Sequence, residues 1–268
     1  MNILMICVNY NSYREVNDYL DSISRAFDNS AQKINLKVIV VDNSVNTTKL
    51  VGRFAYRVIQ LFPKENLGYL KGLTYGLRKV YDSNINYDYV IYSNVDLIIT
   101  DNFFNELSSL KIDDCVGCIA PSIYSISEKR DRNPKIIQRI SKRKLQILKI
   151  LYRYPCLNTI YEKSLFRYRR NKINSDQEGY IYAPHGSFMI FREAMFEKLL
   201  KIEYPVFLFG EEIYIAEILR KNKLKTFYTP KIRVIDFDHV STGKLKSNDY
   251  YRLNYLATEM LLKEFFNE

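Results

Sequence analysis

Strand and helix patterns alternate along the first hundred residues, and this alternation constrains the fold more than any other feature of the chain. Runs of mostly apolar residues at 2–8, 36–41 and 89–92 are typical of strands. Between them, segments 12–27 and 68–80 repeat apolar residues at helical spacing. Strands that alternate with helices favour a parallel sheet covered by helices. We therefore expect an α/β domain with a Rossmann-like, mostly parallel sheet.

Polar residues follow three of these strands. Asn9 and Asn11 follow the first, Asp42 ends the second, and Asn94 and Asp96 follow the third. Because the carboxyl ends of parallel strands meet at one edge of a sheet, these side chains should lie close together. Carboxylate and amide oxygens suit a divalent cation, which can in turn hold a diphosphate. Each residue alone is equally consistent with a turn or a helix cap, so their convergence carries the prediction.

Glycines recur every fourth residue where the helix at 68–80 begins. Gly68, Gly72 and Gly76 would share one helix face and allow close backbone approach. The spacing matches neither a dinucleotide fingerprint nor a P-loop, which excludes those two nucleotide-binding classes. Helix-to-sheet packing explains Gly76, whereas Asn66 and Gly68 at the helix entry are candidates for ligand binding.

The second half of the chain carries three further candidates. Gly186 and Ser187 lie in a polar interruption of the apolar run at 180–192 and could line a pocket. Glu211 and Glu212 begin a predicted helix directly after an aromatic segment. The helix dipole explains one acidic residue there, but a carboxylate against an apolar wall can also act as a general base. His239 ends a strand-like run and is a candidate metal ligand.

The net charge of +10 is concentrated in one segment. Residues 129–172 contain fifteen basic and two acidic residues, and 136–152 has the pattern of a basic amphipathic helix. Such a helix suits an anionic membrane surface, and the alternatives are a solvated basic face or nucleic acid. No helix-turn-helix, zinc-finger or RNP-like motif accompanies it, so we expect no nucleic-acid partner.

The sequence predicts a cytoplasmic location, peripheral on the inner face of the membrane. No apolar run approaches the roughly 18 residues of a membrane span. The apolar residues 3–8 lack the basic flank and cleavage site of a signal peptide. The CxxC at Cys115 and Cys118 has no second pair to complete a zinc site, so reduced thiols are expected.

The order of these motifs resembles the family-two glycosyltransferases, in the branch that includes rhamnosyltransferase-like enzymes. The resemblance is carried by Val8–Asn11, Val40–Ser44, Asn66–Gly72, Ser93–Asp96, Gly186–Glu193, Phe207–Glu212 and His239. It implies a single GT-A domain over residues 1–268. Within it we expect a nucleotide-binding half at 1–125, a basic helical insert at 126–178 and an acceptor and catalytic half at 179–268.

The resemblance also implies roles for individual residues. The nucleotide and the donor sugar would be bound by Asn9, Asn11, Asp42, Asn66, Gly68, Asn94, Gly186 and Ser187. Asp96 and His239 would hold Mg²⁺ or Mn²⁺ against the diphosphate. Glu212 would be the catalytic base, with Glu211 as its neighbour in the acidic pair. Asn94 replaces the first carboxylate of the family's metal motif, which leaves strict metal dependence open.

By this resemblance the chain is an inverting hexosyl- or deoxyhexosyltransferase. The donor would be a UDP- or dTDP-linked sugar, and the acceptor a hydroxyl of a lipid-linked glycan in bacterial surface polysaccharide synthesis. One alternative is a sugar nucleotidyltransferase, which would be expected to show a glycine- and lysine- or arginine-rich loop after the first strand. The other is a non-catalytic basic module that binds membrane or nucleic acid, which would not explain the polar strand ends.

Overall fold

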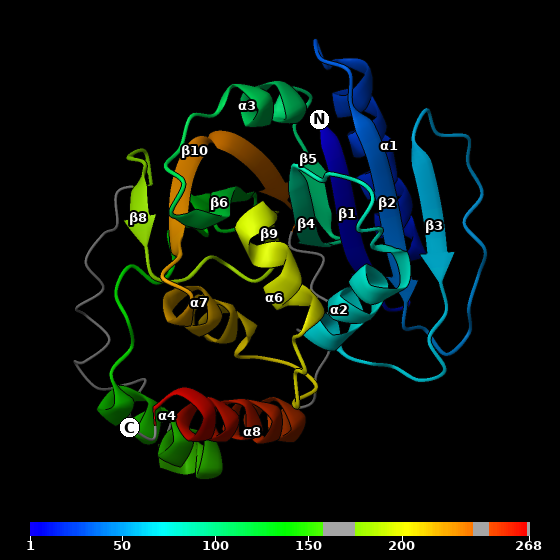
Figure 1. The fold of residues 1–268 in the computed structure, drawn as a ribbon. Coiled ribbons are helices and arrows are strands. Elements are labelled where there is room, and N and C mark those ends of the chain that lie inside the picture. Colours follow the sequence, from blue (N-terminus) through cyan, green and yellow to red (C-terminus); the bar gives the residue numbers. More distant parts are fainter. Residues whose placement is uncertain (158–174, 238–246, 267–268) are drawn as a thin grey trace.

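The computed structural model describes residues 1–157, 175–237 and 247–266 (Figure 1). Its centre is one large sheet with helices on both faces. The first half of the sheet consists of β3 (Arg57–Leu61), β2 (Asn35–Asp42), β1 (Asn2–Asn9) and β4 (Tyr89–Asn94), in that order. These four strands are parallel, as the alternating pattern predicts.

The second half of the sheet mixes strand directions. It continues with β9 (Phe188–Arg192), β6 (Val116–Ser125), β10 (Lys225–Asp236) and β5 (Leu97–Ile99). Strand β9 runs antiparallel to both β4 and β6, while β6 and β10 are parallel. The short strands β7 (Arg130–Asp131) and β8 (Gly179–Ile181) pair with β6 and β10. One sheet therefore joins the two predicted halves of the chain.

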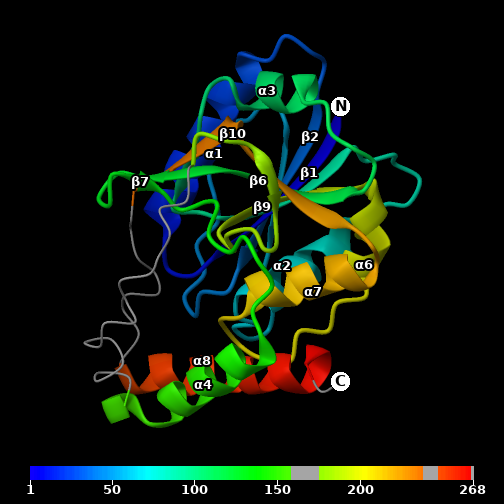
Figure 2. The same ribbon diagram turned by 90° about the vertical axis from the view of Figure 1, so that its left-hand side faces the viewer.

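Two apolar cores lie on opposite faces of this sheet. Helices α1 (Tyr13–Asp28) and α3 (Phe103–Ser109) bury their apolar residues on one face. The other face is covered by α2 (Tyr69–Val80), α6 (Phe196–Leu200), which follows the 3-10 turn Glu193–Met195, and α7 (Glu211–Lys221). Outside α7 lie α8 (Ser247–Phe265) and α4 (Lys142–Arg153), which pack against each other and form an additional helical layer on this side (Figure 2).

The predicted basic helix begins six residues later than the sequence pattern indicates. Helix α4 starts at Lys142, and the Ser141 hydroxyl accepts a hydrogen bond from the Lys144 amide at 3.3 Å. The Ile136 carbonyl instead accepts the backbone amides of Tyr182 and Ala183. Because these strand-like bonds hold 136 extended, the helical side-chain spacing there does not produce a helix. In the described ranges, no helix combines the length and apolarity needed to cross a bilayer.

Candidate active site

The carboxyl ends of β1, β2 and β4 meet as predicted. In the strand register Asn9 lies opposite Asp42, and Val8 lies opposite Asn94. The Asn9 Nδ2 donates a hydrogen bond to Asp42 Oδ1 at 3.0 Å, and both side chains are buried. The register of the parallel sheet therefore brings the first three polar motifs to one edge.

Asp42 is held by four donors at the floor of this edge. Besides Asn9, its oxygens accept hydrogen bonds from the Tyr13 hydroxyl at 2.8 Å, Gln60 Nε2 at 3.0 Å and the Ser44 amide at 3.1 Å. Asn11 follows in a left-handed turn with φ 56°, a conformation that Asn tolerates, and its amide donates to Ser44 Oγ at 2.8 Å. Asp42 is thus oriented by the protein before any ligand binds.

Gly68 forms the entrance of α2, where no other residue fits. It has φ +75°, and a Cβ atom there would lie 2.0 Å from the Phe207 carbonyl oxygen. The Asn66 side chain accepts the Gly68 amide at 2.9 Å, and the Asn43 side chain donates to the Gly68 carbonyl at 2.9 Å. Asn66 and Gly68 therefore shape the point where the loop before α7 crosses the start of α2. Gly76 packs on the sheet, as predicted.

The Gly186 turn lies directly against the acidic pair at the start of α7. A Cβ atom on Gly186 would lie 3.1 Å from Glu211 Cγ and 3.4 Å from Glu212 Cγ. The Gly186 carbonyl accepts a hydrogen bond from the Tyr69 hydroxyl at 2.8 Å. The Ser187 carbonyl accepts the Asn94 amide at 2.8 Å, which joins this turn to the end of β4. Motifs far apart in the sequence thus surround one small region.

The two adjacent glutamates have different electrostatic surroundings. Burial and the charge of Glu212 raise the pKa of Glu211 to about 8. Burial alone would also raise the pKa of Glu212, but the Lys135 ammonium, 2.9 Å from Glu212 Oε1, brings it down to about 2. At neutral pH the pair therefore holds one proton, on Glu211, and Glu212 is the ionised member. Such divergent pKa values are typical of acid–base sites.

His185 supports the turn in its neutral form. Its Nδ1 lies 2.8 Å from Ser187 Oγ, and its amide donates to the buried Asn133 side chain at 2.9 Å. Desolvation of the ring and the nearby charge of Lys135 lower the pKa of His185 to about 3. The histidine therefore adds no positive charge beside the glutamates at neutral pH.

Asp96 presents a buried oxygen that lacks a partner. Its Oδ1 accepts no hydrogen bond from any residue that the structure describes. Burial and the charge of Asp236 raise the pKa of Asp96 to about 6, while a side-chain hydrogen bond from Asn94 opposes this rise. A buried carboxylate oxygen without a donor is uncommon in proteins and suits a hard divalent cation. Asp96 therefore fits the predicted role of metal ligand.

The rest of the predicted metal site is not defined. His239 lies outside the described residues. Within residues 1–157, 175–237 and 247–266, no three His, Cys, Asp or Glu side chains gather as a metal cluster would require. Asp236, the acidic residue that acts on Asp96, is itself paired with Arg132 at 2.6 Å. The pairing of Asp96 and His239 remains a prediction.

Three residues of this region are absent from the sequence-based set. Tyr69 lies near Glu211 and Asp96. Burial, and then the negative charges of these two residues, raise the pKa of Tyr69. The sequence does not single out Lys135, because charge counting does not distinguish one basic residue of segment 129–172 from its neighbours. Asp236 lies in the run that ends at His239, and its position beside Asp96 arises only from the pairing of β10 with β5.

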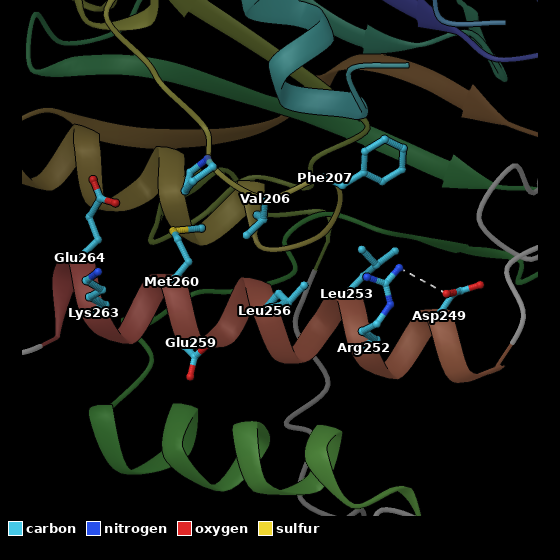
Figure 3. A pocket seen from close by; sticks show the side chains of 11 residues that line it. Val206, Phe207, Asp249, Arg252, Leu253, Leu256, Glu259, Met260, Lys263 and Glu264 are labelled. Carbon is cyan, nitrogen blue, oxygen red and sulfur yellow. Dashed lines mark hydrogen bonds and ion pairs between the residues drawn. The ribbon is translucent and has the colours of Figure 1, made fainter. Parts of the chain in front are cut away.

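A groove of about 980 Å³ adjoins this region, between the loop before α7 and helix α8 (Figure 3). Its lining residues are Pro205, Val206, Phe207, Asp249, Arg252, Leu253, Leu256, Glu259, Met260, Lys263 and Glu264. None of the predicted site residues lines it. Gly210, next to Glu211, packs against Ala257 and Leu261 of the same helix. The groove therefore lies alongside the acidic pair and does not contain it.

Comparison with sequence families and curated sequences gives one match. The model of the family described as "Glycosyl transferase family 2" matches residues 4–200 of the chain. This range includes the ends of β1, β2 and β4 and the Gly186 turn, and it stops before the acidic pair. No curated protein matches the chain at a significant level.

Several solved structures have a similar fold. S. aureus TarS has a TM-score of 0.55 and 14% identity, over 100% of this chain and 41% of TarS. GalNAc-T7, solved with UDP, GalNAc and Mn²⁺, has a TM-score of 0.60 and 13% identity, over 98% of this chain and 49% of that protein. S. aureus TarS 1–349 in complex with UDP-GlcNAc has a TM-score of 0.51 and 15% identity, over 100% and 68%. The chain thus spans under half the length of the first two proteins.

Proposed function

The chain belongs to glycosyl transferase family 2, and from this premise we propose that it transfers a sugar from a nucleotide diphosphate to an acceptor hydroxyl, with inversion at the anomeric carbon. Its mixed α/β structure is the GT-A fold. The observation that carries the proposal is the contact of the Gly186 turn with Glu211 and Glu212, beside the edge that holds Asp42 and Asp96.

The donor is proposed to bind at the carboxyl edge of the parallel strands. Its nucleotide and diphosphate would contact Asn9, Asn11, Asp42, Asn66, Gly68 and Asn94. Buried Asp42 lies at the floor, and Gly68 leaves room where a side chain would collide with the Phe207 carbonyl. Gly186 and Ser187 would border the sugar. The sugar would then lie between the nucleotide residues and the acidic pair.

Glu212 is proposed as the general base. As the ionised member of the pair, it can accept the proton of the acceptor hydroxyl. The acceptor oxygen then forms a bond to the anomeric carbon while the bond from that carbon to the diphosphate oxygen breaks on the opposite face. The bond electrons leave with the nucleoside diphosphate. Glu211, which carries a proton at neutral pH, limits the pair to one negative charge.

A divalent cation is proposed at Asp96. The unpartnered Oδ1 of Asp96 would bind Mg²⁺ or Mn²⁺, and His239 would complete the site. When bound, the cation would neutralise charge on the departing diphosphate. Support for a cation comes from the structure of GalNAc-T7 with Mn²⁺, which shares this fold.

The substrates are proposed more narrowly from the resemblance to rhamnosyltransferase-like enzymes. The donor would be a UDP- or dTDP-linked hexose or deoxyhexose. A structure of TarS with UDP-GlcNAc supports a UDP donor, at the level of a shared fold. The acceptor would be a lipid-linked glycan of a bacterial surface polysaccharide, and the enzyme would act as a peripheral protein on the inner membrane face. Family membership favours this function over a nucleotidyltransferase or a non-catalytic module.

A donor screen tests the proposed function. UDP-, dTDP- and GDP-sugars are added with and without Mn²⁺, and hydrolysis and the thermal unfolding midpoint are measured. We expect one nucleotide class to stabilise the protein and to be hydrolysed slowly. Asp42→Ala should abolish the stabilisation, whereas Glu259→Gln on α8 should retain it. If no sugar nucleotide stabilises the folded wild-type protein or is hydrolysed by it, the proposal is wrong.

A further inference from the structure

Helix α4 has two apolar stripes, and only one of them is covered. Leu145 and Leu151 are buried on the side that packs against α8. A second stripe faces solvent, and 43% to 54% of each of its residues is exposed. This outer stripe comprises Ile147 and Ile150 of α4, together with Tyr154 and Leu157, which follow the end of the helix at Arg153. Since a surface helix normally buries its apolar residues in one stripe, the outer stripe requires its own explanation.

The charges around the outer stripe have one sign. Between Lys142 and Arg153 the helix contains five basic residues and no acidic residue. Lys142, Arg143 and Lys144 are exposed at its first turn, beside Ile147. Of these five basic residues, Lys149 forms an ion pair with Glu259 of α8, with 2.7 Å between Nζ and Oε1. The outer stripe therefore lies within a positively charged surface.

The helix is also fixed firmly to the rest of the molecule. In addition to the Lys149–Glu259 pair, Arg153 lies over the Tyr255 ring of α8. Just before α4, Arg139 donates to the buried Glu217 of α7 at 2.7 Å and 3.1 Å. Both ribbon views place α4 and α8 together in the layer farthest from the sheet (Figures 1 and 2). A broad flat partner could therefore reach α4 without meeting the sheet.

We propose that the outer stripe of α4 inserts into the headgroup region of an anionic phospholipid bilayer, with Arg143 and Lys144 on lipid phosphates. Apolar side chains flanked by lysine and arginine are the pattern of a helix that lies in a membrane interface. Nucleic acid explains the charge but not the exposed aliphatic side chains of Ile147 and Ile150, because single-stranded bases need aromatic platforms and a duplex offers mainly phosphates.

A membrane-binding surface extends the proposed function, and its purpose rests on that function. A transferase bound to the bilayer would meet a lipid-linked acceptor at the membrane surface. The groove of Figure 3 lies on the other side of α8 from α4. A bilayer under α4 would therefore leave the groove and the acidic pair uncovered. Vesicle binding is measured without donor or acceptor, so the two proposals can fail separately.

Vesicle sedimentation tests the surface. The full-length protein is mixed with vesicles of phosphatidylcholine alone or of equal parts phosphatidylcholine and phosphatidylglycerol. We expect binding only to the anionic vesicles. Ile147→Ser with Ile150→Ser should weaken it about tenfold, because two apolar insertions are lost. Arg143→Gln should weaken it about fivefold, since a basic residue near an anionic surface contributes on the order of 1 kcal/mol.

The matched control is Gln146→Ser, which changes an exposed polar residue of the same helix and should bind like wild type. All variants alter exposed side chains, and their thermal unfolding and sugar-nucleotide stabilisation should match wild type. Equal binding to both vesicle types would overturn the proposal. So would unchanged vesicle binding by the Ile147→Ser, Ile150→Ser double variant, or binding to RNA that exceeds vesicle binding and is lost in Arg143→Gln alone.

Discussion

Lys135 Nζ lies 2.9 Å from Glu212 Oε1 and connects the basic segment to the acidic pair of the candidate active site. The lysine side chain is 47% exposed and the glutamate side chain 16%. This contact explains why two adjacent, desolvated carboxylates differ in ionisation: the cation stabilises charge on Glu212, and that charge in turn raises the pKa of Glu211. The basic segment therefore contributes to the proposed chemistry as well as to surface charge.

Glu212→Gln should reduce sugar transfer by at least about a hundredfold, the usual contribution of a general base. The amide preserves the size of the side chain but cannot take the acceptor proton. Stabilisation by the sugar nucleotide should persist, because Glu212 is not placed in the nucleotide pocket. Initial transfer rates and thermal shifts are compared with those of Glu259→Gln, which removes a charged partner of a lysine away from the site. Near-normal transfer by folded Glu212→Gln would exclude Glu212 as the base.

Glu211→Gln should be much milder. The pKa of Glu211 is raised to about 8 by burial and by the charge of Glu212, so the side chain is already neutral at pH 7. Glutamine mimics that neutral form in size and charge. We expect transfer at pH 7 within about tenfold of wild type, well above that of Glu212→Gln. A reversed order of the two variants in the same assay would assign the base to Glu211.

Lys135→Met should move the acidic limb of the pH–rate profile to higher pH. With the cation present, the pKa of Glu212 is about 2, and the base stays ionised through the mildly acidic range. Without it, burial raises the pKa of Glu212 above its ordinary value of 4.5, so activity is lost earlier as the pH falls. Lys149→Met removes a cation from Glu259 and should leave the limb in place. An unshifted limb in Lys135→Met would contradict the role of this ion pair.

Much of the N-terminal half of the fold could be predicted because its signals are local. Apolar runs define the strands, and a parallel register necessarily brings Asn9 opposite Asp42. The contacts of Lys135 with Glu212 and of Tyr69 with Gly186 join residues 77 and 117 positions apart. No local pattern encodes such pairs, since they depend on how the second half of the sheet and the segment before α4 fold back.

The same limit explains the error at 136–141, where the sequence pattern predicts a helix and none forms. Side-chain spacing there is helical, but the Ile136 carbonyl is taken by the amides of Tyr182 and Ala183. A non-local backbone bond overrides a local preference. The antiparallel position of β9 between β4 and β6 is non-local in the same sense, because nothing in its own residues specifies its neighbours.

Gly68→Ala should destabilise the protein and weaken donor binding. Its φ of +75° is unfavourable for alanine, and the added Cβ would lie 2.0 Å from the Phe207 carbonyl, so the loop leading to Glu211 must move. We expect a loss of about 1–3 kcal/mol in unfolding free energy, the usual cost of such strain. Gly179→Ala is the matched control, because no atom lies within 4 Å of the position of its Cβ. Denaturant unfolding with and without the sugar nucleotide measures both effects, and equal stability of the two variants would argue against a tight crossing at Gly68.

Asp96→Asn should separate metal binding from stability. In wild type, Asp96 Oδ1 is buried and accepts no hydrogen bond from the described residues, and Asp236 adds a second negative charge nearby. A buried carboxylate oxygen without a donor destabilises a fold unless a cation compensates its charge. The neutral amide should therefore leave stability without cation unchanged or increased, and should lose most of the additional stabilisation that Mn²⁺ gives together with the sugar nucleotide.

Calorimetric scans of both proteins, with nucleotide and with or without Mn²⁺, measure the two effects. Asp249→Asn, an exposed carboxylate on α8, should leave both unchanged. If Asp96→Asn kept the full Mn²⁺ effect, the cation would bind elsewhere. Asp96 would then be a buried charge that lowers stability and has no role in metal binding.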